Sequence, residues 1–370
     1  MHTETASSIA RLLAGAGRLA RSGKLMEATA AIQRALGMTP IVGSEKRAQH
    51  PAPGMVLDGL VTERREAPAP TRTESPREAG ANFRAHAIDA ATDVRHYKLY
   101  TPSAAAAGTP RPLLVMLHGC TQDPDDFAAG TRMNALAERE GWFVLYPAQA
   151  QRSNISKCWN WFNPGDQRHG GGEPALLAAM TREVVARNAI DADRIYVAGL
   201  SAGGAMAAIL GREYPDLFAA VGIHSGLPQG AASDVASAFA TMQSGDRPRP
   251  VKGPARAVPT IVFHGDRDAT VHPAHGRHVI DDALAQSAAG AAPTVSVEID
   301  PGGVAGRRVT RSVYRDAQGR SRAELWELHG AGHAWSGGSA AGSYTDPAGP
   351  DASAQMLRFF GEQRGRNVQP

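Results

Sequence analysis

From residue 81 to the end of the chain, short apolar runs alternate with segments of helical periodicity, and this alternation restricts the fold more than any other feature. The segment RPLLVMLHG contains the continuous apolar run PLLVML and ends in glycine, which is typical of a parallel strand buried on both faces. The longer segment EPALLAAMTREVVARN has helical spacing and places Pro174 near its first turn. Strands that alternate with helices predict an α/β fold, in which helices cover both faces of a mostly parallel sheet.

The same pattern locates the individual strands. We predict them in the segments VRHYKLYTP, RPLLVMLHG, WFVLYP, RIYVAGLS, FAAVGIHSG, PTIVFHGD and AELWELHG. Within SVYRDAQGRSRAELWEL, residues 316–319 have the composition of a hairpin turn. We therefore expect one antiparallel pairing near the end of the chain.

The first 80 residues differ in character from the rest. Residues 1–37 contain two short runs of helical spacing and are predicted to form a helix pair. One such pair cannot bury its own apolar stripe, which favours self-association or attachment to an apolar surface. Residues 38–80 combine proline with mixed charge and few large apolar residues, so we predict a linker. The α/β domain is expected at residues 81–370.

Charge and hydropathy exclude several classes of function. The net charge of +3 is carried by residues 1–80, so the α/β domain has no concentrated basic face and we expect no nucleic-acid partner. No apolar run is long enough to predict a membrane span. The first residues lack a basic start followed by an unbroken apolar stretch, so we expect no secretory signal peptide and, by that criterion, a cytoplasmic location.

The chain has two cysteines, Cys120 and Cys158, with no CxxC spacing and no cluster of histidines. This pattern does not predict a zinc site, and we expect neither a metal ion nor an organic cofactor. The two residues are compatible with separate buried thiols or with one disulfide bond. The absence of a signal peptide favours the first interpretation, and their positions along the chain favour the second.

The segment RIYVAGLSAGGAMA contains the pattern G-x-S-x-G at the point where a predicted strand gives way to a helical run. A sharp strand-to-helix turn exposes the serine, and the small residues Gly199 and Gly203 supply room where the backbone nearly touches itself. The following helix directs free N–H groups and a positive dipole towards a developing oxyanion. We therefore predict that Ser201 is a nucleophile.

A serine nucleophile needs a base and an orienting carboxylate, which in this fold class follow in the order Ser, acid, His. Past one predicted strand, Asp268 lies deeper in its loop than Asp266 and is the preferred acid. Past the last strand, His333 lies at a loop tip whereas His329 still ends the strand, so His333 is the preferred base. The other candidate histidines are expected to be structural; they are His224, His264 and His272.

An oxyanion hole is expected in the loop after an early strand, which here reads His118-Gly119-Cys120. We predict that the backbone N–H groups of Cys120 and Ala202 form the hole. His118 is expected to position the loop.

Taken together, the segments LHGCTQDPDDFAAGTRMNALAEREGWFVLYPAQ, CWNWFNPGDQRHGGGEP, RIYVAGLSAGGAMA, FHGDRDATVHP and GAGHAWSGG resemble the PHB depolymerase family of esterases. The resemblance extends over residues 90–362. It implies the α/β-hydrolase fold, which is shared by the similar feruloyl and acetylxylan esterases. It also implies Ser201 as nucleophile, Asp268 as acid, His333 as base and His118 in the oxyanion loop.

The resemblance implies a serine esterase that forms an acyl-enzyme and uses no cofactor. Secreted polymer depolymerases of this family usually carry a signal peptide and a separate substrate-binding domain, and we expect neither here. Polyhydroxyalkanoate or polyester oligomers and short-chain esters are therefore the expected substrates. A feruloyl or acetylxylan-type carbohydrate esterase is the alternative. A granule- or partner-binding protein on a hydrolase scaffold is disfavoured, because binding requires no complete Ser, Asp and His set.

The resemblance also bears on the cysteines and the tryptophans. In such enzymes the segment CWNWF lies beside the active site, which implies a Cys120–Cys158 disulfide that clamps the oxyanion loop. Such a bond, like the family, would indicate an extracellular location. Three tryptophans are candidates for an apolar substrate platform, with core packing as the alternative; they are Trp159, Trp161 and Trp335.

The division of the chain generates a prediction. A chain that starts near Gly80 should fold and keep most of its turnover on p-nitrophenyl butyrate, because every expected catalytic residue follows residue 117. It should lose self-association or attachment to apolar surfaces. The measurements are kcat and the oligomeric mass of both chains. Loss of turnover in a folded shortened chain would contradict this division.

Overall fold

The computed structural model describes residues 82–90, 93–248, 251, 258–285, 294–300 and 307–365. The predicted helix pair at 1–37 and the linker at 38–80 lie outside these residues. Both therefore remain predictions, as does the boundary near residue 81.

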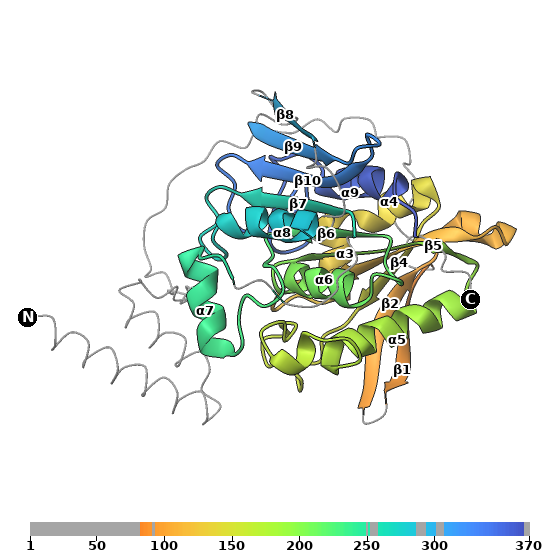
Figure 1. The fold of residues 1–370 in the computed structure, drawn as a ribbon. Helices are drawn as coiled ribbons and strands as arrows, with labels where there is room; N and C mark the ends of the chain where they lie inside the picture. Colours follow the sequence, from red (N-terminus) through yellow and green to blue (C-terminus); the bar gives the residue numbers. More distant parts are fainter. Residues whose placement is uncertain are drawn as a thin grey trace, which may run out of the picture. The chain divides into compact units, whose positions relative to one another are not determined.

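A single large sheet organises the described residues (Figure 1), with the strand order β1-β2-β4-β3-β5-β6-β7-β10-β9-β8. The strands are β1 (Phe83–Ala90), β2 (Asp93–Tyr100), β3 (Arg111–Leu117), β4 (Phe143–Pro147), β5 (Ile190–Leu200), β6 (Ala220–His224), β7 (Thr260–Gly265), β8 (Thr294–Asp300), β9 (Val309–Arg315) and β10 (Ser321–Leu328). The run from β4 to β10 in this order is parallel, whereas β1, β2, β8 and β9 pair antiparallel. The predicted α/β class is therefore confirmed, and the expected hairpin joins β9 to β10.

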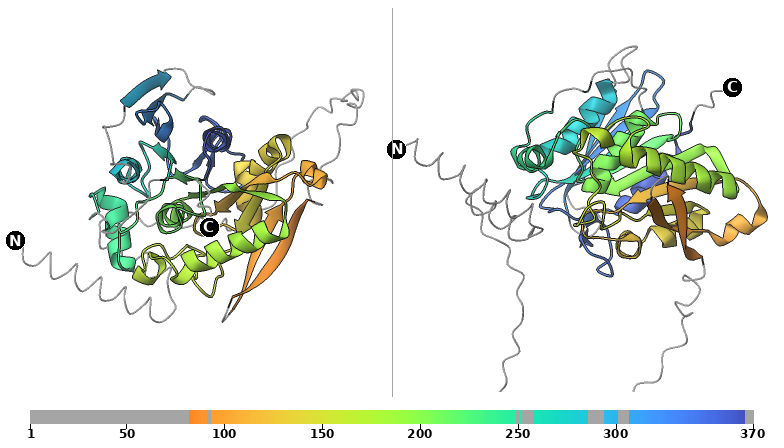
Figure 2. Two further views of the ribbon diagram at one scale, coloured as in Figure 1. Left: turned by 45° about the vertical axis from the view of Figure 1, so that its right-hand side comes forward. Right: turned by 90° about the horizontal axis from the view of Figure 1, so that it is seen from below.

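The seven α-helices of the described residues lie on both faces of the sheet (Figure 2). They are α3 (Pro124–Thr131), α4 (Met133–Glu140), α5 (Gly172–Arg187), α6 (Ala202–Glu213), α7 (Val235–Ser244), α8 (Ala274–Ala285) and α9 (Ala352–Gly361). Among the described helices, none has both the length and the apolar composition needed to cross a membrane.

The central strand β3 shows how the sheet creates two cores. Leu113, Val115 and Leu117 pack in a cluster that includes apolar side chains of α5, α6 and α8. Leu114 and Met116 pack in the opposite cluster, with side chains of α3, α4 and α9. Side chains alternate across a strand, so a strand buried on both faces must be apolar throughout. This is the physical reason for the continuous apolar run PLLVML.

The carboxyl ends of the parallel strands meet at one edge of the sheet, as they must in any parallel sheet. The loops after β3, β5, β6, β7 and β10 all leave from this edge. After β10 the chain also forms a small parallel pair from β11 (Trp335–Ser336) and β12 (Thr345–Asp346). Every catalytic residue predicted from the sequence lies in one of these loops.

Candidate active site

Ser201 occupies a sharp turn between β5 and α6. Its φ of 57° lies in the left-handed region, which non-glycine residues rarely adopt. A Cβ atom on Gly199 would come within 2.4 Å of the Gly203 carbonyl carbon, and one on Gly203 within 2.1 Å of the Leu117 oxygen. Both positions therefore require glycine, and the strand-to-helix turn predicted from G-x-S-x-G is confirmed.

His224, at the end of β6, connects this turn with the chain that follows His333. Its carbonyl oxygen accepts a hydrogen bond from the Ser201 N–H at 2.9 Å. Its ring Nε2 accepts one from the Ser336 N–H at 3.0 Å. Burial lowers the pKa of His224 to about 3, so the ring is neutral and can accept this bond. These contacts agree with the structural role predicted for His224.

Asp268 and His333 form a hydrogen-bonded pair at the carboxyl ends of β7 and β10. The His333 Nδ1 lies 2.7 Å from Asp268 Oδ2. The other carboxylate oxygen accepts hydrogen bonds from the backbone N–H groups of Thr270 and Val271, each at 2.9 Å. This arrangement places the proton on Nδ1 and leaves Nε2 of His333 as the basic nitrogen.

The charge of Asp268 depends on these partners. Burial by itself raises the pKa of this carboxyl group, but hydrogen bonds from His264 and His333 and from the Val271 N–H outweigh that effect. The net result holds the pKa of Asp268 well below its usual range. Asp268 is therefore an ionised acceptor, which is what the orienting member of a triad must be.

The two competing candidates, Asp266 and His329, pair with each other instead. His329 Nδ1 lies 2.9 Å from Asp266 Oδ2, and its Nε2 lies 2.8 Å from Thr310 Oγ1. The Asp266 side chain is 43% exposed, whereas that of Asp268 is fully buried. Since both ring nitrogens of His329 already have partners, this geometry favours His333 as the base.

The contact that would complete a triad is not formed in the structure. Within the described residues, Ser201 Oγ makes no hydrogen bond to His333, although both residues follow parallel strands at the same edge of the sheet. Catalytic hydrogen bonds often become short only when substrate binds. The roles of Ser201 and His333 therefore remain predictions, which the Asp268–His333 pair supports.

The predicted oxyanion loop lies against the first turn of α6. A Cβ atom on Gly203 would also lie 2.6 Å from the His118 oxygen, which shows how closely the two backbones approach. Ala202 is the first residue of α6, and such N–H groups have no partner inside the helix. In the described part of the chain the Cys120 N–H likewise has no hydrogen-bond acceptor. This arrangement supports Cys120 and Ala202 as the two donors.

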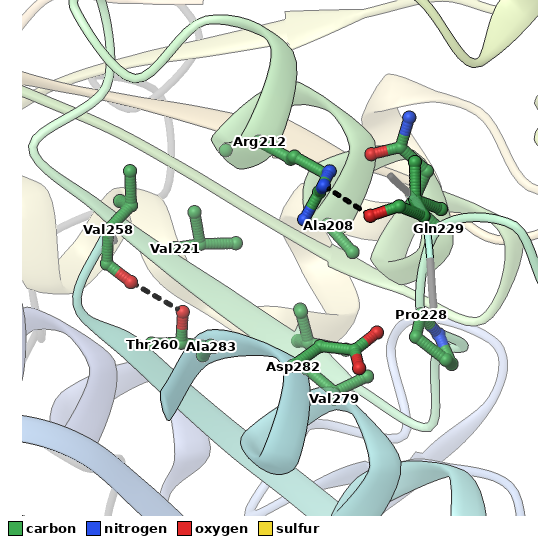
Figure 3. A pocket seen from close by; sticks show the side chains of 13 residues that line it. Ala208, Arg212, Val221, Pro228, Gln229, Val258, Thr260, Val279, Asp282 and Ala283 are labelled. Carbon is green, nitrogen blue, oxygen red and sulfur yellow. Dashed lines mark hydrogen bonds between the residues drawn. The ribbon is translucent and has the colours of Figure 1, made fainter. Parts of the chain in front are cut away.

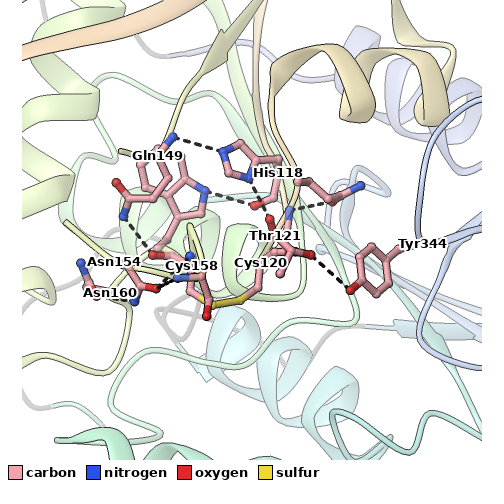
Figure 4. The surroundings of a disulfide bond; sticks show 12 residues. His118, Cys120, Thr121, Gln149, Asn154, Cys158, Asn160 and Tyr344 are labelled. Carbon is pink, nitrogen blue, oxygen red and sulfur yellow. Dashed lines mark hydrogen bonds between the residues drawn. A yellow bond between two sulfur atoms is a disulfide. The ribbon is translucent and has the colours of Figure 1, made fainter. Parts of the chain in front are cut away.

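Cys120 and Cys158 form a disulfide bond (Figure 4), as the resemblance implied. The bond joins the oxyanion loop to the segment CWNWF, and the neighbouring Thr121 N–H donates to the Ser156 oxygen at 2.6 Å. The loop is thus held to residues 156 and 158 by one polar and one covalent contact next to each other.

The three tryptophans are in the core. Trp159, Trp161 and Trp335 are 1%, 5% and 1% exposed. Trp159 donates a hydrogen bond through Nε1 to the His118 oxygen at 3.1 Å, and Trp335 stacks on the His224 ring. Side chains so deeply buried expose little surface to a substrate, which favours the core-packing alternative, and the substrate platform stays a prediction.

The sequence analysis did not identify several polar residues around the site. Glu173 and Gln149 form a buried hydrogen bond behind the oxyanion loop, and Thr121 Oγ1 lies 3.2 Å from the Tyr344 hydroxyl. Thr121 and Tyr344 both have positive φ, 67° and 51°, and such strain is common at functional sites. No local pattern signals these residues, because their partners lie far away in the chain.

A pocket lies elsewhere, between α6 and α8 (Figure 3). It is lined by Ala208, Gly211, Arg212, Val221, Ile223, Pro228, Gln229, Val251, Val258, Thr260, Val279, Asp282 and Ala283. None of the predicted catalytic residues is among them, so this pocket is not the candidate active site. Among the described residues, no cluster of three or more His, Cys, Asp or Glu side chains could hold a metal ion.

Comparison with known proteins adds to this geometry. The family described as "Esterase PHB depolymerase" matches residues 87–298. Poly(3-hydroxyalkanoate) depolymerase C of Paucimonas lemoignei is 32% identical over 63% of this chain and 57% of its own length. Feruloyl esterase B of Neurospora crassa is 34% identical over 40% of this chain and 49% of its own. The chain thus spans about half the length of these relatives.

A solved structure supports the fold. Acetyl xylan esterase from Aspergillus awamori superposes with a TM-score of 0.59, at 18% identity, over 75% of this chain and 99% of that chain. The fold is the α/β-hydrolase fold that the resemblance implied.

The disulfide generates a prediction about stability and rate. The bond closes a segment of 38 residues, so its loss should lower the free energy of unfolding by up to about 4 kcal/mol. A looser oxyanion loop should also lower kcat more than it raises KM. The measurements are denaturant unfolding and kinetics of the oxidised and reduced protein. Two reactive thiols in the native protein would show that the bond is absent in solution.

The two Asp–His pairs generate a second prediction. Asp268→Asn should lower kcat by about 10³- to 10⁴-fold, because the amide no longer selects the Nδ1–H tautomer of His333. Asp266→Asn is the matched control and should cost less than about tenfold, because its exposed pair lies outside the triad. The measurement is kcat on p-nitrophenyl butyrate. The reverse order would identify Asp266 as the acid.

Proposed function

Since this chain belongs to the Esterase PHB depolymerase family, we propose that it hydrolyses carboxylic esters through an acyl-enzyme on Ser201. The observation that carries the proposal is the buried Asp268–His333 pair, which follows strands that end at the same edge as the Ser201 turn. An ionised carboxylate on Nδ1 leaves Nε2 free to take a proton from a serine hydroxyl.

In this mechanism Ser201 Oγ attacks the ester carbonyl carbon while His333 Nε2 takes its proton. The N–H groups of Cys120 and Ala202 stabilise the oxyanion, and His333 then donates the proton to the departing alcohol. Water repeats the sequence on the acyl-enzyme and releases the acid. Asp268 remains ionised throughout and stabilises the imidazolium that forms between the steps.

For the substrate we favour polyhydroxyalkanoate or polyester oligomers and short-chain esters. The relative in Paucimonas lemoignei, whose match covers more of this chain than that of the feruloyl esterase, supports this choice. A feruloyl or acetylxylan-type carbohydrate ester is the second candidate, which the feruloyl esterase relative supports. The two are distinguished by comparing kcat/KM for p-nitrophenyl esters of increasing acyl length, hydroxybutyrate oligomers, methyl ferulate and acetylated xylan.

The nucleophile assignment generates a further prediction. Ser201→Ala should lower ester hydrolysis by about 10³-fold or more, because triad members act as a unit. Ser225→Ala is a matched control, since Ser225 also has positive φ but lies after β6. A serine-directed phosphonate should label Ser201, as mass spectrometry of peptides would show. Retention of a tenth of the activity in Ser201→Ala would contradict the assignment.

A further inference from the structure

The two ring nitrogens of His118 make different hydrogen bonds. Nε2 lies 3.1 Å from the backbone nitrogen of Gln149, which can only donate. Nδ1 lies 2.8 Å from the carbonyl oxygen of Gly119, which can only accept. Only the neutral ring with its proton on Nδ1 satisfies both contacts.

The bond to the Gly119 oxygen has a consequence for Cys120. The Gly119 carbonyl and the Cys120 N–H belong to the same peptide unit, which is planar and trans, so the two groups point in opposite directions. A ring that holds the oxygen on one side therefore directs the N–H to the other. That N–H is the donor proposed above for the oxyanion hole.

The other backbone groups of this loop already have partners. The Gly119 N–H donates to Gln122 Oε1 at 2.9 Å, and the Cys120 oxygen accepts from Thr121 Oγ1 at 2.6 Å. The Thr121 N–H donates to the Ser156 oxygen. Among the described residues, the Cys120 N–H is thus the backbone donor of residues 119–121 that has no hydrogen-bond acceptor.

Behind His118, a buried carboxylate holds Gln149 in place. The Gln149 amide Nε2 donates to Glu173 Oε1 and to the Cys158 oxygen at 2.9 Å. Glu173 also accepts from the Asn160 N–H at 2.7 Å and from Asn160 Nδ2 at 2.8 Å. Glu173, at the start of α5, thus connects Gln149, which precedes Cys158, with Asn160, which follows it. Gln149 and Asn160 are labelled in Figure 4.

We propose that Glu173, Gln149 and His118 are positioning residues that set the direction of the oxyanion donor Cys120 N–H through the Nδ1–H tautomer of His118. The inference rests on the esterase function proposed above and adds these residues to it. None of the three touches the reacting atoms. Their effect is expected in the transition state, where the oxyanion develops, more than in substrate binding.

Burial keeps His118 in the required state. The residue is 1% exposed, and burial lowers its pKa to about 4. The ring is therefore neutral across the pH range in which esterases are assayed, and its Nε2 stays available as an acceptor for the Gln149 N–H.

Two substitutions at one position separate the two contacts of the ring. In His118→Asn the amide Nδ2 can take the place of Nδ1 and still donate to the Gly119 oxygen. In His118→Gln the longer side chain can reach the place of Nε2 and accept from Gln149, but the Nδ1 donor is lost. We expect His118→Gln to lose about 100-fold in kcat, the cost of one oxyanion donor, and His118→Asn to keep at least about tenfold more activity. KM for p-nitrophenyl butyrate should change less than kcat in both.

The controls separate positioning from folding. Thermal unfolding of both variants should be compared with that of the wild-type protein. The affinity for a boronic acid inhibitor, which mimics the tetrahedral intermediate, should fall in proportion to kcat. Glu173 accepts three hydrogen bonds, and Glu173→Gln replaces one of its acceptor oxygens with a donor. This variant disturbs the same contacts from the side of Glu173. It should also lower kcat more than it raises KM. Equal kcat values for His118→Asn and His118→Gln in folded proteins would overturn the inference.

A spectroscopic measurement tests the inference without any activity. Nitrogen-15 NMR of the histidine rings should show His118 as the Nδ1–H tautomer at pH 7, and that signal should be lost in His118→Asn. The Nε2–H tautomer would overturn the inference even in an active enzyme. A wild-type protein that has the Nδ1–H tautomer of His118 but no esterase activity would instead contradict the proposed function.

Discussion

The close approach of Gly203 to the end of β3 is the constraint on which the rest of the site depends. The first turn of α6 lies directly against the carbonyl oxygens of Leu117 and His118, at a distance that no side chain would allow. This contact brings the N-terminus of α6 next to the loop after β3. Because Ser201 precedes α6 and Cys120 belongs to that loop, one backbone contact determines the relative position of the proposed nucleophile and of the two proposed oxyanion donors.

A second constraint is the cost of a buried charge. The Asp268 side chain is fully buried, and an ionised carboxylate there is tolerated only if its oxygens find donors. Two backbone N–H groups and two histidines provide them. The exposed Asp266 has no comparable need, and its partner His329 also contacts Thr310. Both pairs consist of one aspartate and one histidine from the same two loops. Only the carboxylate of Asp268 is buried, and burial is what holds its histidine in one orientation.

Two neutral histidines lie on either side of the strand that leads to Ser201, His118 after β3 and His224 at the end of β6. His118 and His224 are both buried, and burial lowers the pKa of each, to about 4 and about 3. Each ring therefore carries no charge. His118 joins the Gly119 oxygen to the Gln149 N–H, and His224 accepts from the Ser336 N–H. The ionised Asp268 follows β7, on the other side of the Ser201 turn from the loop that holds Cys120. This separation suits the proposed reaction, in which negative charge develops near Cys120 and Ala202.

The sequence by itself determined the features that depend on local backbone geometry and on periodicity. The alternation of strands and helices, the Gly199–Gly203 turn and the hairpin before β10 all follow from residues close together in the chain, and the structure agrees with them. The order of the parallel strands also explains why residues after β3, β5, β7 and β10 reach one edge. The pairing of Cys120 with Cys158 came from the family resemblance, because spacing alone left it open.

Only the tertiary structure decided what depends on burial and on distant partners. Position in the sequence favoured Asp268 over Asp266 as the acid. That Asp268 pairs with His333, and that both ring nitrogens of His329 have other partners, became visible only from the contacts in the structure. The tryptophans looked equally suited to a surface or a core, since an indole is large and apolar in either place, and the structure buried all three. Glu173 and Gln149 gave no signal at all, because a polar side chain becomes a positioning residue only through neighbours that the fold brings to it.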